Sequence, residues 1–396
     1  MQHLQKLKAC SIKIQSNYSS FKKIWGVMRK NTKFRVWLFT LIGLALLLVF
    51  FVLKTLRDAG YFKTILPHFA GKTIPLKAQA GTEDLTIAQA LGIALISCDD
   101  RKAKIKQPNA TNLPEGNIYS LDLKTASALP KPLVLVRPQA PPFHPHGISL
   151  VQNKEGAYFL WVINHTETPE KGKEHRIELY AWDKADSLKL MKTYTDPAWL
   201  RSPNDIVGLD EQRFYFTNDH GYTTRFWRSM EDYLQLAVSD VIYFDGQRYT
   251  KALSGLAYPN GINISTDQQT VFVALTTPRK VLVCQRQSPS GQLVVQEEIF
   301  VDTGVDNIEI DPEGNLWVGC HPKLLAFMAH AQSTAQRKLS PSQVIKIYKN
   351  KAGSYTFEEV FLNDGASLSG SSVGAVYRKK LLIGSVFEDL LLGEMQ

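Results

Sequence analysis

The chain has 396 residues, with 46 Lys and Arg against 37 Asp and Glu, and a formal net charge of +9. Nine of the basic residues lie in the first 35 positions, which contain no acidic residue, so the other 37 basic residues balance the 37 acidic ones. Beyond this tail there is no excess positive charge, and nucleic-acid binding loses its main sequence argument.

An apolar segment follows the basic tail. Residues 36–53, VWLFTLIGLALLLVFFVL, carry no charge and are long enough to cross a bilayer as a helix. The polar leader before them is longer than that of a signal peptide, which favours an uncleaved anchor over a cleaved signal. Because basic residues stay preferentially on the cytoplasmic side, residues 1–35 should form a cytoplasmic tail. The part after residue 53 should then lie in the periplasm, the ER lumen or the cell exterior, beginning with a linker over residues 54–74.

One phrase recurs six times after this linker. Each copy has a small polar group, an Ile- or Val-rich strand, a tight turn and a second strand, and each begins roughly 45 to 65 residues after the last. The copies are residues 81–97, 144–165, 202–222, 258–275, 304–322 and 369–387. Such a period is typical of four-stranded blades. We therefore predict an all-β fold, a six-bladed β-propeller over residues 75–396, preceded by a single transmembrane helix.

Short segments between the copies supply the remaining strands of each blade. They alternate or are rich in branched residues, and Gly, Pro, Asn and Asp bound them; they are residues 118–123, 177–183, 241–246, 281–286 and 344–350. Residues 225–238 instead have apolar side chains near helical spacing, which predicts a short surface helix.

The polar residues at the start of the copies should meet in space. In a propeller, the turn that enters each innermost strand points at the central channel, so equivalent residues of different blades converge. The residues at this place are Glu83 with Asp84, Asn204 with Asp205, Asn260, and Asp306 with Asn307. Converging buried carboxylates repel one another unless a cation lies among them. An irregular set of oxygen donors is typical of Ca²⁺ rather than of Zn²⁺ or Mg²⁺.

The second copy differs from the others. His146 stands where they have Asn or Asp, and His165 ends the same hairpin. A single His in a strand turn is more often structural, but two of them beside a predicted metal favour a general base. Cys98, Cys284 and Cys320 show no zinc spacing and are expected to be buried thiols.

These phrases resemble the serum paraoxonases, a family of calcium-dependent lactonases and arylesterases that fold as six-bladed propellers. The shared phrases are EDL, PHGIS, VINH, NDIV, TNDH, NGINIS, VDNI, LWVGCHP and KLLIG, in the same order and at similar spacing from about residue 81 to 387. The resemblance implies two calcium ions, and it implies that His146 and His165 form a dyad that activates water.

The resemblance also implies a role for further residues. The catalytic calcium would be held by Glu83, Asn204, Asn260, Asp306 and Asn307, and the structural calcium by Asp84, Asp205 and the main-chain carbonyl of Ile148. A possible substrate pocket would contain Trp317, Asp219, His220 and an unpaired Cys320. The expected function is calcium-dependent hydrolysis of small-molecule lactones and/or aryl esters by a membrane-anchored propeller of undetermined oligomeric state.

Two features depart from the family, and three alternatives remain open. The cysteines that close the family's ring are missing, so strand pairing alone must close it, and the first-blade loop CDDRKAKIKQPNATN leaves the substrate open. A non-catalytic membrane-tethered scaffold is the main alternative, because a fold alone does not fix function. A sugar lactonase would share the calcium but not the paired His phrase. A serine hydrolase is suggested by G-x-S-x-G at 370–374, without the helix and later His that it needs.

Overall fold

The computed structural model describes residues 32–107, 114–168, 172–333 and 336–396. The chain divides into two compact units, residues 1–57 and 58–396. The first carries the apolar helix, and the second carries every described strand. The predicted cytoplasmic tail falls almost entirely outside the described residues.

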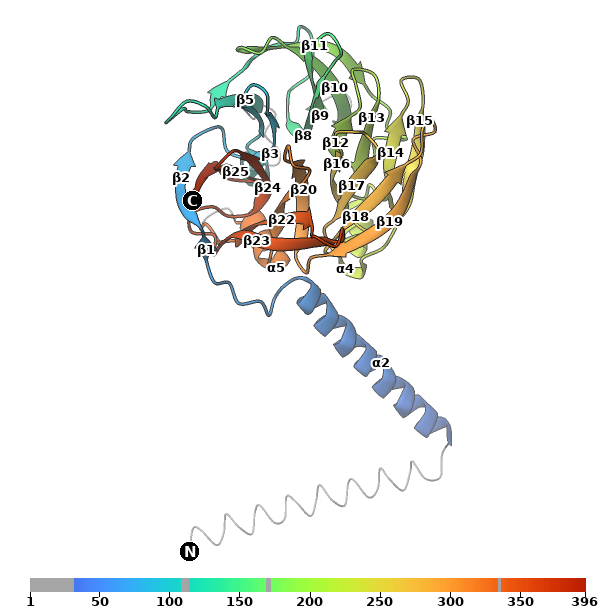
Figure 1. Ribbon diagram of the computed structural model, residues 1–396. Coiled ribbons are helices and arrows are strands. Elements are labelled where there is room, and N and C mark those ends of the chain that lie inside the picture. Colours follow the sequence, from blue (N-terminus) through green and yellow to red (C-terminus); the bar gives the residue numbers. More distant parts are fainter. Residues whose placement is uncertain (1–31, 108–113, 169–171, 334–335) are drawn as a thin grey trace, which may run out of the picture. The chain divides into compact units, whose positions relative to one another are not determined.

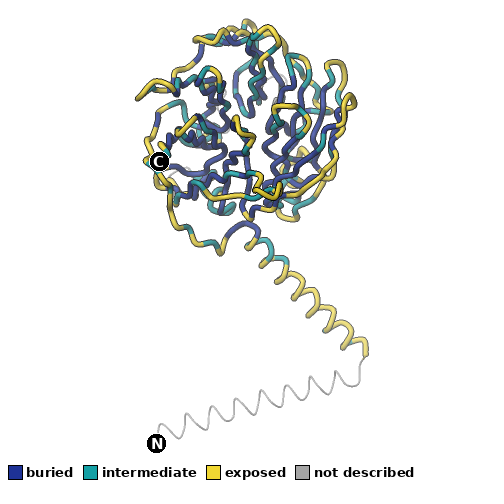
Figure 2. Tube along the Cα trace, viewed as in Figure 1, coloured by how far each residue is buried: buried dark blue, intermediate teal, exposed yellow. Residues whose placement is uncertain are grey.

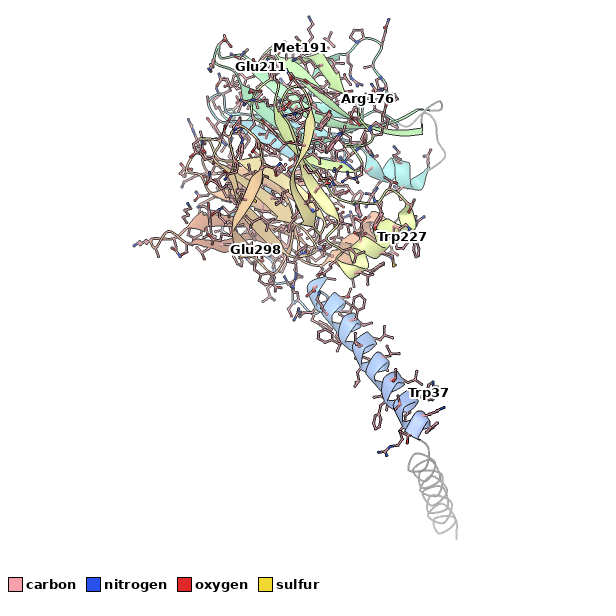
Figure 3. The ribbon with its side chains drawn as sticks, turned by 90° about the vertical axis from the view of Figure 1, so that its right-hand side faces the viewer. Trp37, Arg176, Met191, Glu211, Trp227 and Glu298 are labelled. Atoms are coloured by element: carbon pink, nitrogen blue, oxygen red, sulfur yellow. The ribbon has the colours of Figure 1, made fainter. Side chains whose placement is uncertain are left out.

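The apolar segment forms helix α2 (Thr32–Asp58), which is longer at both ends than the predicted span of 36–53. An 18-residue window of it has a mean hydropathy of 2.9, and none of that window is buried. Figure 2 shows the helix largely exposed, and Trp37, labelled in Figure 3, is 59% exposed. At a rise of about 1.5 Å per residue, 27 residues extend ~40 Å. The helix is therefore long and apolar enough to cross a membrane.

Six sheets surround a central channel in the second unit (Figure 1). The innermost hairpins are β3 (Thr82–Ala88) and β4 (Ile93–Cys98), β8 (Pro145–Gln152) and β9 (Tyr158–Thr168), β12 (Pro203–Gly208) and β13 (Phe214–Asn218), β16 (Pro259–Ile264) and β17 (Thr270–Leu275), β20 (Gly304–Ile310) and β21 (Leu316–His321), and β24 (Ser371–Tyr377) and β25 (Lys380–Ser385). Each is one of the six repeated phrases. Each innermost strand also contacts the innermost strands of both neighbouring blades, which closes the ring. The predicted six-bladed β-propeller is confirmed.

The outer strands complete the blades. They are β5 (Asn117–Asp122) and β6 (Lys131–Pro132), β10 (Gly172–Trp182) and β11 (Ser187–Tyr194), β14 (Ser239–Phe244) and β15 (Tyr249–Leu256), β18 (Lys280–Arg286) and β19 (Leu293–Phe300), β22 (Ser342–Lys349) and β23 (Tyr355–Asn363), and β26 (Leu390–Met395). One short strand, β7 (Val134–Val136), runs parallel to β11 at the edge of the second blade. All other pairs in the sheets are antiparallel, as connected hairpins require.

The ring is closed by a strand from the start of the propeller sequence. Strand β2 (Gly71–Leu76) pairs with β26 over six residues and becomes the outermost strand of the last blade. A shorter strand, β1 (His68–Phe69), joins β23 of the fifth blade. The predicted linker of 54–74 thus contains β1 and most of β2, so the propeller begins before residue 75. As expected without the family's cysteines, strand pairing joins the two ends of the ring.

Apolar side chains pack between neighbouring blades. Leu85 and Ile96 of the first blade share a buried cluster with Val373 and Leu382 of the sixth, and similar clusters lie between other blades. Burial of each such side chain contributes about 1.5–3 kcal/mol relative to exposure. This packing fixes the blades relative to one another, so the first residues of all innermost strands are held at the same end of the channel.

Three short helices lie at that end. They are α3 (Arg101–Lys106), α4 (Arg225–Leu234) and α5 (Leu324–Ala331), and each follows the second strand of an innermost hairpin. Since that strand is antiparallel to the first, it ends where the first begins. Helix α4 confirms the helix predicted at 225–238 but ends four residues earlier; its Trp227 is exposed (Figure 3). Helices α3 and α5 were not predicted.

Candidate active site

The polar pairs lie in irregularities of the innermost hairpins. In all six blades the strand register shifts at the polar pair, between Thr82 and Asp84, Pro145 and Ile148, Pro203 and Ile206, Pro259 and Ile262, Val305 and Ile308, and Ser371 and Val373. A bulge bends a strand and redirects the side chains of the extra residues. This explains why residues that form strands poorly recur at the start of an innermost strand.

Two of the bulges contain a glycine because neighbouring backbones approach closely there. A Cβ on Gly147 would lie 2.6 Å from Cα of Asp205, and one on Gly261 would lie 2.4 Å from the carbonyl oxygen of Asp306. No side chain fits at either place. These contacts bring the bulges of adjacent blades together around the channel.

The five residues predicted to hold the catalytic ion come from four innermost strands and are all buried. They are Glu83 of β3, Asn204 of β12, Asn260 of β16, and Asp306 and Asn307 of β20. Four of their oxygens have no hydrogen-bond partner: Oε2 of Glu83 and the Oδ1 atoms of Asn204, Asn260 and Asn307. A buried acceptor left without a donor costs about 1–3 kcal/mol. Four such atoms at one place indicate that something other than protein satisfies them.

The amide groups of the three asparagines are oriented by their own contacts. Nδ2 of Asn307 donates to Oε1 of Glu83 at 3.0 Å, Nδ2 of Asn260 to the Thr276 hydroxyl at 3.2 Å, and Nδ2 of Asn204 to Oδ2 of Asp219 at 3.4 Å. Each amide nitrogen therefore has a hydrogen-bond acceptor, while the amide oxygen has no donor. A site that lacks donors and presents oxygens fits a cation.

The charges in this set also fit a cation. Burial raises the pKa of the Glu83 and Asp306 carboxyls, because it disfavours their charged forms. Within the described residues no three His, Cys, Asp or Glu side chains are arranged as a metal site, and the set here has two carboxylates and three amides. That mixture of hard oxygens suits Ca²⁺.

The second predicted ion site lies further along the same strands. Oδ2 of Asp84 accepts from the amide of Ile148 at 2.7 Å, and Oδ2 of Asp205 accepts from the amide of Ile262 at 2.7 Å, so each carboxylate joins two blades. Burial raises the pKa of both well above the ordinary value, and the charge of Asp205 raises that of Asp84 further. Both line a cavity of about 610 Å³ inside the ring.

Glu309 lines the same cavity and was not predicted. Burial raises its pKa to about 8, and its charge in turn raises the pKa of Asp84 and Asp205. Its sequence signal is a charged residue between Ile308 and Ile310 in an innermost strand. Carboxylates that face one shared space inside the ring cannot all ionise cheaply without a counter-charge.

The two predicted catalytic histidines lie together. The rings of His146 and His165 are 4.8 Å apart and meet edge to face at 72°, and Nε2 of His146 lies 3.6 Å from Oε1 of Glu83. Burial lowers the pKa of His146 to about 3, with the nearby positive charge of Arg101 as the next cause. Burial also lowers the pKa of His165 well below its ordinary value. Both rings are therefore neutral near pH 7.

Arg101 of α3 contacts His146 of this pair. The sequence did not predict this contact. Its guanidinium donates to the carbonyls of Gly81 at 3.1 Å and Pro145 at 2.9 Å, and Nη2 lies 3.3 Å from Nδ1 of His146. Because a guanidinium only donates, this contact makes Nδ1 the acceptor and assigns the ring hydrogen to Nε2. His146 then presents an N–H toward Glu83.

A third histidine extends the pair and was also missed. His175 of β10 stands directly opposite His165 of β9 in the strand register, and the two Nδ1 atoms are 2.7 Å apart. The sequence alone does not bring His175 to His165, because their contact depends on the register in which β9 and β10 pair.

Asp219 and His220, predicted for the pocket, lie beside the first ion set. Asp219 accepts from Asn204, as described above, and Nδ1 of His220 is 2.8 Å from Oδ1 of Asp219. Although burial opposes it, hydrogen bonding to Asp219 and Asp232 raises the pKa of His220 to about 9. This positive ring is balanced by two carboxylates.

The other two predicted pocket residues face the core. Trp317 packs against Val344 and Phe361, and its Nε1 donates to Asp311 at 2.9 Å. In the strand register Trp317 stands opposite Glu309 and not opposite the bulge, so the structure does not bring it to the histidines. Cys320 is unpaired, as expected, but fully buried in another apolar cluster. Burial raises the pKa of its thiol well above the ordinary value.

The G-x-S-x-G phrase is part of a strand. Ser371 and Ser372 lie in β24 and are fully buried, and the hydroxyl of Ser372 donates to the main-chain carbonyl of Glu83 at 2.5 Å. A strand follows, so the exposed turn of a serine nucleophile is not formed here.

Together these features define a six-bladed β-propeller that presents oxygen donors and imidazoles at one end of its central channel. The chain belongs to the arylesterase family, whose model, described as Arylesterase, matches residues 73–395. Human serum paraoxonase/arylesterase 1 is 33% identical over 321 residues, and human serum paraoxonase/arylesterase 2 is 31% identical over 323; each match covers 80% of this chain and 86% of the relative. A luciferin-regenerating enzyme has a similar structure, with a TM-score of 0.48, 11% identity and coverage of 82% of this chain and 95% of its own. The resemblance seen in the sequence is thus confirmed.

Proposed function

We propose that this chain hydrolyses lactones and/or aryl esters with the help of bound calcium. Membership of the arylesterase family supports an esterase or lactonase. The observation that carries the calcium part is the group of four buried oxygens without donors. Buried polar atoms cost stability unless they are satisfied, and a bound cation would satisfy these four.

The proposed ligands form two sets. Glu83, Asn204, Asn260, Asp306 and Asn307 would hold the ion that faces the substrate, and Asp84, Asp205 and the carbonyl of Ile148 would hold a second ion inside the ring. The first ion supplies a positive charge that polarises the substrate carbonyl and favours negative charge on its oxygen. The second would join blades that the two carboxylates already connect.

The protein itself would handle the proton of the attacking water. His146 and His165 lie against each other and beside Glu83, so both belong to the same polar centre. Their burial keeps both rings neutral, which is the form that takes part in hydrogen bonding as donor and acceptor. Asp219 would hold Asn204 in place through its hydrogen bond.

The proposal predicts activity on a defined panel. Full-length protein in detergent should hydrolyse at least one of a set of acyl-homoserine, aliphatic and aryl lactones and aryl esters. Excess chelator should reduce the rate to that of the uncatalysed reaction, and added Ca²⁺ should restore it, because the charge that stabilises the oxyanion has been removed and returned. A scaffold would hydrolyse no member of the panel, and full activity in chelator would contradict the calcium requirement.

We further propose that helix α2 anchors the protein with the basic tail in the cytoplasm and the propeller outside. Its length and hydropathy support an anchor, and the nine basic residues before it support the orientation. The protein should remain in the membrane pellet through high-salt washing, and protease should reach the propeller only from the non-cytoplasmic side. A peripheral protein in the same membranes serves as the control that salt does release. Release of this chain by salt would exclude the anchor.

A further inference from the structure

We infer that His175 is a positioning residue of the proposed hydrolysis: it accepts a hydrogen bond from His165 and thereby makes His165, rather than His146, the group that takes the proton from water. The inference rests on the proposed function for the identity of the reaction. The contacts of the three imidazole rings, however, are properties of the structure alone.

The geometry between His165 and His175 requires a shared hydrogen. The rings meet edge to face at 84°, with centroids 4.8 Å apart and the two Nδ1 atoms 2.7 Å apart. That distance is within the range of a hydrogen bond, and two facing lone pairs or two facing hydrogens would repel each other there. One Nδ1 therefore donates and the other accepts.

The direction of this bond decides what His165 can do. If Nδ1 of His165 donates to His175, the neutral ring has its lone pair on Nε2 and can accept a proton there. The resulting positive ring keeps its hydrogen bond to His175, which stabilises it. This is the role of the third group in a catalytic triad, which fixes the tautomer of the base and supports its charged form.

His146 is held in the opposite state. Arg101 occupies its Nδ1, and the ring hydrogen then lies on Nε2, 3.6 Å from Oε1 of Glu83. A ring in this state offers a hydrogen to the channel and has no lone pair left to take one from water. His146 is thus suited to donate a hydrogen bond to a substrate oxygen, and the sequence-based assignment of the base to His146 shifts to His165.

His175 can be replaced and tested because of where it lies in the blade. It lies on the long β9–β10 hairpin next to Arg176, which Figure 3 labels, and it is only partly buried. Removal of its side chain should open a space that a small molecule can enter from solvent. Its replacement should also disturb the fold little, since apolar clusters elsewhere carry the packing of this blade.

The experiment compares two substitutions in the full-length protein. His175→Ala removes the acceptor, and kcat should fall roughly 10²-fold, the lower end of the range for general base catalysis, with KM and the melting temperature unchanged. Added imidazole should restore kcat in this variant. His175→Asn places an amide oxygen where Nδ1 was, so it should keep most of the activity and show no rescue. His68→Ala, at an exposed histidine paired with Glu359 on an outer strand, should change nothing.

A second measurement separates this inference from the proposed function. The ¹⁵N resonances of the His165 ring should show hydrogen on Nδ1 in the wild-type protein and its loss from Nδ1 in His175→Ala. If Nδ1 of His165 carries no hydrogen, or if His175→Ala keeps the wild-type kcat on an active substrate, the inference is wrong. If no substrate is hydrolysed but the ring has the expected tautomer, the proposed function fails while the positioning by His175 stands.

Discussion

Asp306→Ala is expected to abolish hydrolysis and calcium binding at the proposed catalytic site together. Asp306 is one of only two carboxylates in the proposed set, so its loss halves the negative charge that holds the ion. The rate should fall by at least about 10³-fold, because the charge that stabilises the developing oxyanion leaves with the ion. Calorimetric titration with Ca²⁺ and initial rates on the best substrate would measure both effects.

The same variant should behave differently without calcium. Burial raises the pKa of Asp306, which means that its charge is unfavourable in the empty protein. In chelator, Asp306→Ala should therefore lose less stability than it does with calcium, with the remaining loss due to the unpaired Nε2 of His321.

Two further variants act as controls. Asp306→Asn keeps the shape and an acceptor for Nε2 of His321, 2.8 Å away, and should lose calcium affinity without losing the fold. Glu298→Ala removes an exposed carboxylate on β19 and should change neither property (Figure 3). Wild-type calcium affinity in Asp306→Ala would contradict the assignment.

Removal of all calcium should have the largest effect on stability. A ligand that binds only the native state at 1,000 times its dissociation constant stabilises it by about 4 kcal/mol. For the unit of residues 58–396, that corresponds to roughly 6 °C in the melting temperature. The physical reason is the repulsion among Asp84, Asp205 and Glu309, which face one cavity that no described Lys or Arg lines.

Thermal unfolding followed by circular dichroism would test this. The midpoint should fall in excess chelator, recover on adding Ca²⁺, and recover less with Mg²⁺, which requires a stricter octahedral geometry. Glu309→Gln should reduce the difference between the two conditions, because one repelling charge is gone. Identical melting curves with and without calcium would exclude a stabilising ion.

The sequence predicted the parts of the fold that repeat. Six copies of one phrase were enough to predict six blades, and the recurrence of the polar pairs predicted that they converge on the channel. The residues predicted to converge, such as Glu83 with Asn307, do so because equivalent positions in a closed ring face the same axis.

Other residues could not be predicted because their role depends on tertiary contacts. Arg101 lies in helix α3, in a segment that the repeat does not cover. His175 meets His165 only through the pairing of β9 with β10. Trp317 was assigned to the pocket by resemblance alone. In the structure, Trp317 is paired with Glu309, just beyond the bulge in β20, and strand alternation turns its side chain into the core between blades.

The pairing of β2 with β26 also sets the order of events during synthesis. Leu76 leaves the ribosome before its partner Leu390, which lies 314 residues further along the chain. Until then the first strand has an open edge, which is the part of a sheet most prone to pair with other chains. If α2 is already in the bilayer by that time, nearby copies would be confined to one surface with their edges unpaired. Chaperones would then be needed most in the interval before the last blade is complete.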